Sequence, residues 1–195
     1  VILNETVWSI GSSMLSMIIG HISTEFVSAN SIANIIWQCV WVMISGMGNA
    51  TAVVIGNAVG MGKDKEEIKK MAQSIIAVAA VMGVVAAGII LLIRGPVIEF
   101  YEVSRATKDL AMELIVSYAI ILVLQAMSVQ YVVGIFRGGG DTRFAMLIDT
   151  LFLWVFAIPL GAYAGLVLKL APPVVYLLLR CDELFKCTAG FIHMK

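Results

Sequence analysis

Residues 71–93 read MAQSIIAVAAVMGVVAAGIILLI, an apolar run without a single charged side chain. A helix that crosses the hydrocarbon core of a bilayer takes about 20 apolar residues, so this run alone predicts a membrane-spanning helix. Small residues recur in it at every fourth position, at Ala79, Gly83 and Ala87. Such a row lets two helix backbones approach closely. We therefore expect this helix to pack tightly against a neighbour.

Similar apolar segments lie on both sides of this run. Together they predict spans at residues 1–21, 31–60, 71–93, 110–136, 144–168 and 173–192. The 195-residue chain is 61% hydrophobic and 13% charged, with a mean hydropathy of +0.98, whereas an average soluble domain is about 45–50% apolar and about 25% charged. The predicted fold class is an all-α membrane protein, a bundle of six transmembrane helices.

The segments differ in how they begin and end. Residues 31–60 would form a helix of about 45 Å, longer than the ~30 Å hydrocarbon core, so this helix must tilt or project from the membrane. Residues 94–108 are mixed in polarity and predict a loop. Pro172 and Pro173 suit the first turn of the last span, and Asp141 or Thr142 suits the cap of the fifth.

Composition excludes several classes of function. The 13 basic and 13 acidic residues balance, which excludes the basic surface of a nucleic-acid binder. Three cysteines without a CxxC pair predict neither a disulfide framework nor a zinc site. No catalytic triad or phosphate-binding loop stands out, so we expect no enzyme and no cofactor. His21 and His193 lie at span ends without metal-ligand company, so we expect both to be bystanders at the membrane interface. Val1 already lies inside an apolar run, so we expect further chain before it.

The distribution of basic residues predicts the orientation in the membrane. With alternating spans, one side receives Lys63, Lys65, Lys69, Lys70, Arg137, Arg143 and Lys195, and the other receives Arg94, Arg105, Lys108 and Lys169. The richer side is expected to be cytoplasmic, which places the loops 61–70 and 137–143 in the cytoplasm.

Polar side chains inside the apolar spans mark candidate functional positions, because burying them in hydrocarbon is costly. On the second span they follow one stripe about 60° wide at 100° per residue, formed by Asn34, Gln38, Ser45, Asn49 and Gly56. The stripe either hydrogen-bonds to neighbouring helices or lines a cleft that opens and closes. The same alternatives apply to Gln125, Ser128 and Gln130 on the fourth span. On the last span, Asp182 and Glu183 are expected to pair with Lys186 along the helix surface.

Two carboxylates are candidates for binding a coupling cation. Glu5 lies early in the first span beside Asn4 and Trp8, where desolvation lets a carboxylate hold a proton or a monovalent cation. The alternative is that Glu5 lies at the membrane interface. Asp149 follows Arg143 by about 9 Å of helix, and its alternative role is a structural partner for Arg137 or Arg143.

Three stretches resemble one transporter family. The turn GIFRGGGDTR, residues 134–143, resembles the glycine-rich motif between two late helices of the multidrug and toxic compound extrusion (MATE) family. Residues 2–5, ILNE, followed by Trp8 resemble the start of the seventh helix of bacterial members. Residues 48–62 resemble the eighth helix. The resemblance covers essentially the whole chain.

The resemblance implies that residues 1–195 form one six-helix lobe of a twelve-helix, two-lobe transporter of the bacterial plasma membrane, whose N-terminal lobe is missing here. Such transporters export organic, often cationic compounds in exchange for H⁺ or Na⁺ by alternating access of a cleft between the lobes. The family's cation position maps to Glu5, and its loop motif maps to Arg137, Gly138, Gly140, Asp141, Thr142 and Arg143. The candidates for the substrate cleft are the polar residues of the spans together with one tryptophan: Trp8, Asn34, Gln38, Ser45, Asn49, Gln125 and Gln130. Sodium-coupled members carry an acidic residue where this chain has Ala126, so Gln125, Gln130 or Asp149 would have to substitute.

Two rival functions remain open. A lipid or polysaccharide flippase of related architecture would line its cavity with basic side chains, and the expected absence of Lys and Arg from the middle of the spans favours drug export instead. A non-transporting membrane scaffold would seal its polar residues in tight interfaces. Because alternating access needs two lobes, we expect this lobe not to transport alone unless two copies pair.

Overall fold

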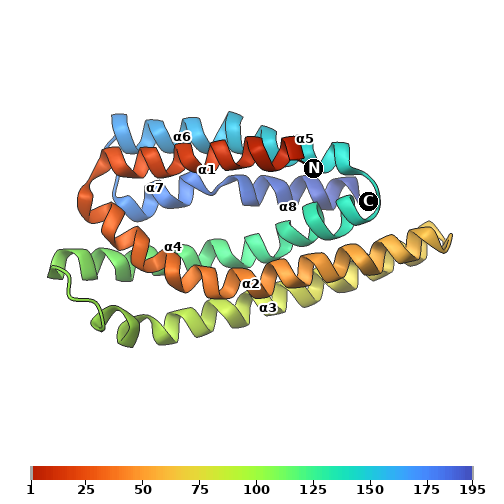
Figure 1. The fold of residues 1–195 in the computed structure, drawn as a ribbon, viewed down its shortest axis with the longest axis horizontal. Helices are drawn as coiled ribbons and strands as arrows, with labels where there is room; N and C mark the ends of the chain where they lie inside the picture. The colour runs from red at the N-terminus through yellow and green to blue at the C-terminus, as the bar shows by residue number, and fades with distance from the viewer. Residues whose placement is uncertain (1, 195) are drawn as a thin grey trace.

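The computed structural model describes residues 2–194, with the side chains of residues 5–194, and every regular element in this range is helical (Figure 1). Three stretches, labelled η, are π-helical turns. The elements are α1 (Ile2–Ile22), α2 (Thr24–Gly60), α3 (Lys65–Glu99), α4 (Arg105–Val129), η1 (Gln130–Arg137), α5 (Thr142–Leu151), η2 (Phe152–Ala157), α6 (Ile158–Ala162), η3 (Tyr163–Val167), α7 (Pro172–Leu179) and α8 (Asp182–His193).

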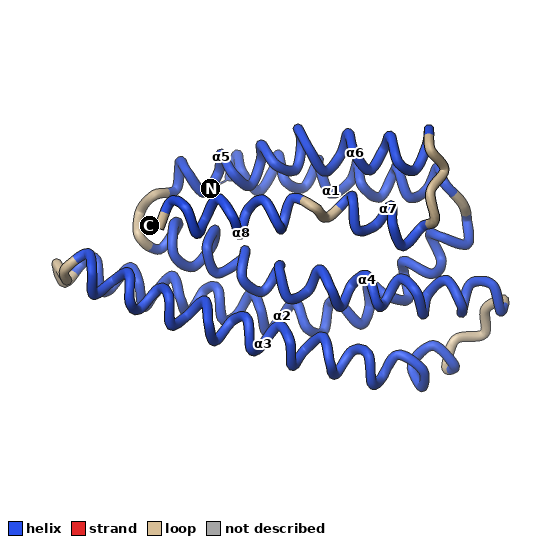
Figure 2. Tube along the Cα trace, turned by 180° about the vertical axis from the view of Figure 1, so that it is seen from behind, coloured by secondary structure: helices blue, strands red, loops and turns tan. Residues whose placement is uncertain are grey.

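The helices form two layers, which Figures 1 and 2 show from opposite sides. One layer contains α2, α3 and α4; the other contains α1, the segment from α5 to η3, and α7 with α8. The loop after α2, the turn after η1 and the C-terminal end lie at one end of the bundle, and the connections after α1, α3 and η3 lie at the other (Figure 1). This arrangement confirms the predicted alternation of six helical segments, while the cytoplasmic side stays a prediction.

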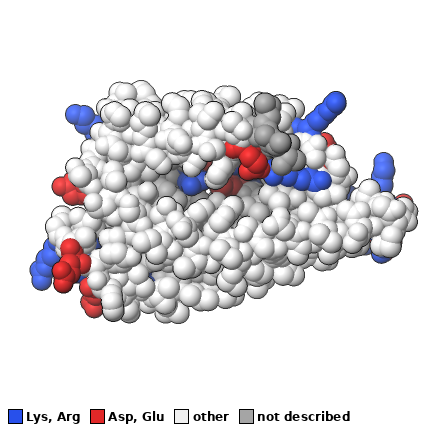
Figure 3. All heavy atoms as spheres, viewed as in Figure 1, with Lys and Arg blue, Asp and Glu red and all other residues white. Residues whose placement is uncertain are grey.

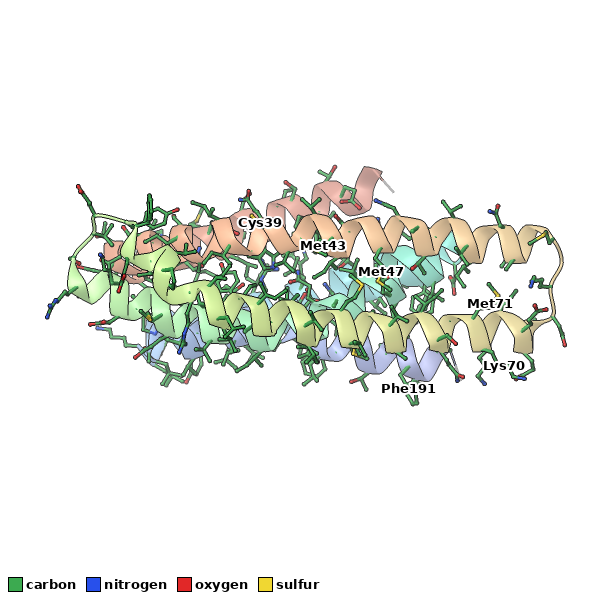
Figure 4. All side chains as sticks on the ribbon, turned by 90° about the horizontal axis from the view of Figure 1, so that it is seen from below. Cys39, Met43, Met47, Lys70, Met71 and Phe191 are labelled. Atoms are coloured by element: carbon green, nitrogen blue, oxygen red, sulfur yellow. The ribbon has the colours of Figure 1, made fainter. Side chains whose placement is uncertain are left out.

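Four segments of the described chain are long and apolar enough to cross a membrane: Thr24–Gly60, Lys65–Glu99, Arg105–Arg137 and Thr142–Val167. The segments α1 and α7–α8 run alongside them (Figure 2). Figure 4 shows α2 and α3 side by side, with Cys39, Met43 and Met47 along α2. Large apolar side chains such as Met43 and Leu92 are exposed on these two helices, as expected of a surface that faces lipid.

The helix ends differ from the sequence expectation at two places. Helix α2 begins at Thr24 rather than near residue 31, because the Ser23 hydroxyl oxygen accepts a hydrogen bond from the Phe26 backbone N–H at 3.0 Å and Phe26 is fully buried. The loop predicted at residues 94–108 is wrong over most of its length, because α3 continues through Pro96 to Glu99 and α4 begins at Arg105. The buried Ile98 side chain holds the last turn of α3 in place.

The last span is interrupted. Pro172 opens α7 as predicted, but α7 ends at Leu179 and α8 begins at Asp182, so Arg180 and Cys181 form a short break (Figure 2). This break places Arg180 near the middle of the span. The expectation that no Lys or Arg lies mid-span is therefore wrong.

Small residues set the closest helix contacts. A Cβ atom added at Gly83 would lie 3.0 Å from the Val123 Cα of α4, which confirms the predicted close packing through this row of α3. A Cβ added at Gly138 would lie 2.6 Å from the Ala52 Cα of α2. The glycine-rich turn thus lets the end of η1 lie directly against the α2 backbone.

Candidate functional site

Arg137, the last residue of η1, joins the two carboxylates predicted to bind a cation. Its Nη1 donates a hydrogen bond to Glu5 Oε1 of α1 at 2.8 Å, and its Nη2 lies 3.7 Å from Asp149 Oδ2 of α5. The Glu5 side chain is 55% exposed and that of Asp149 is 11% exposed. Glu5 and Asp149 therefore meet at one guanidinium, although 144 positions separate them in the numbering. The alternative prediction for Asp149 is a structural partnership with Arg137 or Arg143, and the structure shows the contact with Arg137.

The glycine-rich turn holds Arg137 in this position. Gly138 and Gly139 permit close backbone contact, and Gly140 has a φ of +93°, a conformation that L side chains rarely adopt. Asp141 caps α5, because its carboxylate accepts a hydrogen bond from the Phe144 backbone N–H at 3.3 Å. Thr142 begins α5, and Arg143 is exposed.

His193 also contacts this turn, which corrects its expected role as a bystander. Its Nε2 lies 2.9 Å from Asp141 Oδ2, and its ring stacks on Phe144 with centroids 3.7 Å apart. The end of α8 is thereby attached to the start of α5. In contrast, His21 contacts its own helix through the Met17 carbonyl oxygen.

Helix α8 adds a buried charged cluster that the sequence analysis placed on a helix surface. Lys186 Nζ lies 2.8 Å from Asp149 Oδ1 and 2.8 Å from Asp182 Oδ2. Lys186 and Asp182 are only 3% and 1% exposed. The prediction that these charged residues lie on the helix surface is wrong, because α8 packs among α4, η1, α5 and η2 and its charged face points into the bundle. The sequence feature that could have revealed this buried cluster is the presence of three charged residues at helical spacing within an apolar span.

A cavity of about 120 Å³ connects these groups. Ser128 Oγ of α4 lies within hydrogen-bond distance of Glu183 Oε2. Gln125, one turn earlier, accepts a hydrogen bond from Trp37 Nε1 at 3.0 Å. The lining combines acidic, basic, amide and apolar side chains: Glu5, Trp8, Trp41, Gln125, Ser128, Val129, Val132, Val133, Arg137, Asp149, Glu183 and Lys186. Figure 3 shows charged side chains of both signs in a recess of an otherwise mostly uncharged face.

A second cavity of about 150 Å³ lies toward the other end of the bundle. Its wall includes Asn34, Arg180 and again Trp8. The Tyr118 hydroxyl donates to Asn30 Oδ1 at 3.0 Å, and the Tyr118 and Tyr176 rings stack at 4.3 Å. Arg180 gives this cavity a basic wall, whereas the first cavity is lined by charged side chains of both signs.

The residues predicted to line the cleft have different positions. Trp8 lines both cavities, Gln125 the first and Asn34 the second. Gln38 and Asn49 lie exposed on α2, and the Ser45 hydroxyl donates to the Val42 carbonyl oxygen of its own helix.

Gln130 lies away from both cavities. It is fully buried between η1 and α2, where its Oε1 accepts from the Thr51 hydroxyl at 2.8 Å and its Nε2 donates to the Ile44 carbonyl oxygen at 3.5 Å. The structure thus gives Gln130 a helix-to-helix contact. In the described part of the chain, no group of three or more His, Cys, Asp and Glu side chains is arranged to hold a metal ion.

Comparisons with known proteins agree in family. The MatE family model matches residues 1–163. The chain is 29% identical over 157 residues to a probable multidrug resistance protein NorM of Xylella fastidiosa and 28% identical over 156 residues to the multidrug resistance protein PmpM of Pseudomonas aeruginosa. Each match covers 79% of this chain and 32% of the relative, so the matched part is about a third of the relatives' length.

Solved structures agree in fold. An outward-facing multidrug resistance MATE family transporter of the MOP superfamily superposes with a TM-score of 0.86 at 19% identity, over 98% of this chain and 43% of that one. A MOP superfamily transporter from Pyrococcus furiosus gives 0.85 at 16% identity, over 96% and 41%. With several membrane-spanning helices, the chain is a multi-pass plasma-membrane protein. Because the family model covers most of its length, the chain belongs to the MatE family, the extrusion family that its glycine-rich turn resembles.

Proposed function

We propose that the complete gene product is a secondary active efflux antiporter that exports organic, often cationic compounds in exchange for H⁺ or Na⁺. In this proposal the described helices are one lobe, and a partner lobe completes the cleft that opens alternately to each side of the membrane. The names of the relatives support multidrug transport. The 43% coverage of the similar transporter structure supports a lobe of roughly half its size.

The observation that carries the proposal is the first cavity, where Glu5 and Asp149 share Arg137. A cation that binds either carboxylate competes with Arg137 for it. Since α1 contributes Glu5, and η1 and α5 contribute Arg137 and Asp149, this competition changes how three segments contact one another. The free energy of cation binding is thereby linked to the conformation of the lobe, as alternating access requires.

The walls of the same cavity suit an organic cation. Trp8 and Trp41 offer indole faces, which attract cations through the ring quadrupole, and Val129, Val132 and Val133 offer apolar surface. Apolar walls with a few polar groups accommodate ligands of many shapes.

Reconstituted transport tests the proposal. The complete gene product in liposomes should expel a fluorescent organic cation when a H⁺ or Na⁺ gradient is imposed. Glu5→Gln should slow gradient-driven efflux by about tenfold, within the range given by coupling free energies of about 1–3 kcal/mol. Glu113→Gln, an exposed carboxylate on α4, is the matched control and should keep the original rate. Absence of gradient-driven efflux from the unaltered protein would refute the proposal.

The second cavity favours a second candidate function, movement of an anionic lipid or polysaccharide precursor. Arg180 in its wall is suited to an anionic head group, with Asn34 as a neighbouring polar group. Arg180→Gln should then abolish binding of an anionic lipid-linked precursor. Equal binding by both forms would exclude this function.

A further inference from the structure

Glu183 is a buried carboxyl group without a cationic contact. It is 5% exposed and lines the first cavity. Among the described residues, no Lys, Arg or His side-chain nitrogen lies within 4.0 Å of its oxygens, whereas Asp149 and Asp182 both contact Lys186. An ionised carboxylate in this position would lack the direct pairing that buried charges require.

The charges around Glu183 already balance without it. The carboxylates of Glu5, Asp149 and Asp182 stand against three basic groups, Arg137, Lys186 and Arg180. Asp182 Oδ1 is itself buried without a hydrogen-bond partner in the described chain, so a second negative charge on the adjacent residue would add repulsion. The charged and titratable groups near Glu183 are Asp182, Lys186 and Cys187 on α8, Tyr176 on α7, Arg180 at the break between α7 and α8, and Asp149 on α5.

The hydrogen-bond pattern around Ser128 accommodates one more proton. Ser128 Oγ is within bonding distance of the Gln125 carbonyl oxygen, at 3.3 Å, and of Glu183 Oε2. A serine hydroxyl has one hydrogen to donate. If Glu183 carries a proton, it donates to Ser128 Oγ, and Ser128 donates to the Gln125 carbonyl, so that each hydrogen has its own acceptor.

We propose that Glu183 is the group that carries the coupling proton in this lobe, and hence that the transported ion is H⁺. The proposal rests on the antiport function proposed above and names its ion and its residue. The proton leaves Glu183 for water in the first cavity when the cleft is open to one side of the membrane, and Glu183 takes up a new proton when the cleft is open to the other side. A Na⁺ ion at this position would be repelled by the nearby ammonium of Lys186.

A chain of contacts connects Glu183 to the cleft. When Glu183 loses its proton, it becomes a further carboxylate that competes for Lys186. Lys186 then binds Asp149 less tightly. Asp149 in turn attracts the Arg137 guanidinium more strongly, in competition with Glu5. Loss of the proton on α8 therefore changes the contact of η1 with α1.

Infrared difference spectroscopy tests the protonation of Glu183 independently of transport. The complete gene product, in lipid at neutral pH, should show the carbonyl band of a protonated carboxylic acid. Glu183→Gln should remove the band, and Glu113→Gln should retain it. If Glu183→Gln fails to fold, Ser128→Ala decides: it should keep the band and move it to higher frequency, because one hydrogen bond is lost. A band that persists in Glu183→Gln, or that is unmoved in Ser128→Ala, overturns the inference.

Transport assays separate this inference from the proposed function. In liposomes, a pH gradient should drive efflux, and Glu183→Gln should reduce the rate by about tenfold or more. Efflux driven by a Na⁺ gradient alone would overturn the inference and leave antiport standing. No efflux under either gradient would refute the proposed function, and the infrared band would still show whether Glu183 is protonated.

Discussion

Lys186 allows a sharp test of the buried cluster, because the chain contains a matched exposed pair. Lys186 and Asp182 are four residues apart on α8 and almost fully buried, whereas Lys63 and Glu67 are four residues apart with side chains 33% and 53% exposed. Lys186→Met removes the ammonium, keeps a side chain of similar length, and deprives Asp149 and Asp182 of the lysine that both contact. Removing one partner of a buried ion pair costs about 3–5 kcal/mol. Lys63→Met should cost only about 0.3–0.5 kcal/mol, as for exposed pairs at this spacing.

Denaturant titration of the complete gene product in detergent micelles measures both losses as changes in the free energy of unfolding. A second step separates burial of charge from loss of packing. Adding Asp149→Asn and Asp182→Asn to Lys186→Met also removes the two carboxylates that contacted the ammonium, and replacing a whole buried ion pair is often neutral. This triple variant should recover most of the lost stability. Equal effects of Lys186→Met and Lys63→Met, or no recovery in the triple variant, would show that the cluster is not a buried, mutually dependent set of charges.

Two further predictions concern the packing of the turn and the access to the cavities. Gly138→Ala places a Cβ 2.6 Å from the Ala52 Cα and should destabilise the protein by about 1–3 kcal/mol in the same titration, whereas Gly88→Ala, which meets no atom within 4 Å, should stabilise it by up to about 1 kcal/mol. In a cysteine-free background, Asn34→Cys should react with a small water-soluble thiol reagent, because residue 34 lines the second cavity, and Gln130→Cys should not, because residue 130 is fully buried. Equal stability of the two alanine variants, or equal labelling of the two cysteine variants, would contradict these expectations.

The sequence predicted the order and number of the helical segments, because runs of about 20 apolar residues have few alternatives in a membrane. Helix ends were less predictable. The extension of α3 past Pro96 depends on burial of Ile98 against other helices, which no local pattern reveals. The break at Arg180 and Cys181 also lacks a proline or glycine to announce it.

The site was predictable only in its parts. The resemblance supplied Glu5 and Arg137 separately, but their contact joins residues 132 positions apart and follows from the packing of α1 against the turn. The spacing of Asp182 and Lys186 showed that they share a helix face. It could not show that this face points inward, because that depends on the packing of α8 against α4, η1, α5 and η2.

The length of α2 and α3 has a consequence for how movement of the lobe can be observed. Helix α2 has 37 residues and therefore measures about 55 Å. At a tilt of about 20° it still spans about 52 Å along the membrane normal, more than the ~40–45 Å of a bilayer with its head groups. The hairpin tip at Gly62 therefore stands in water at the end of a lever arm. A rotation of about 10° about the far end would carry it through about 10 Å, so a spectroscopic label there would magnify a small rocking motion inside the membrane into a readily measured displacement.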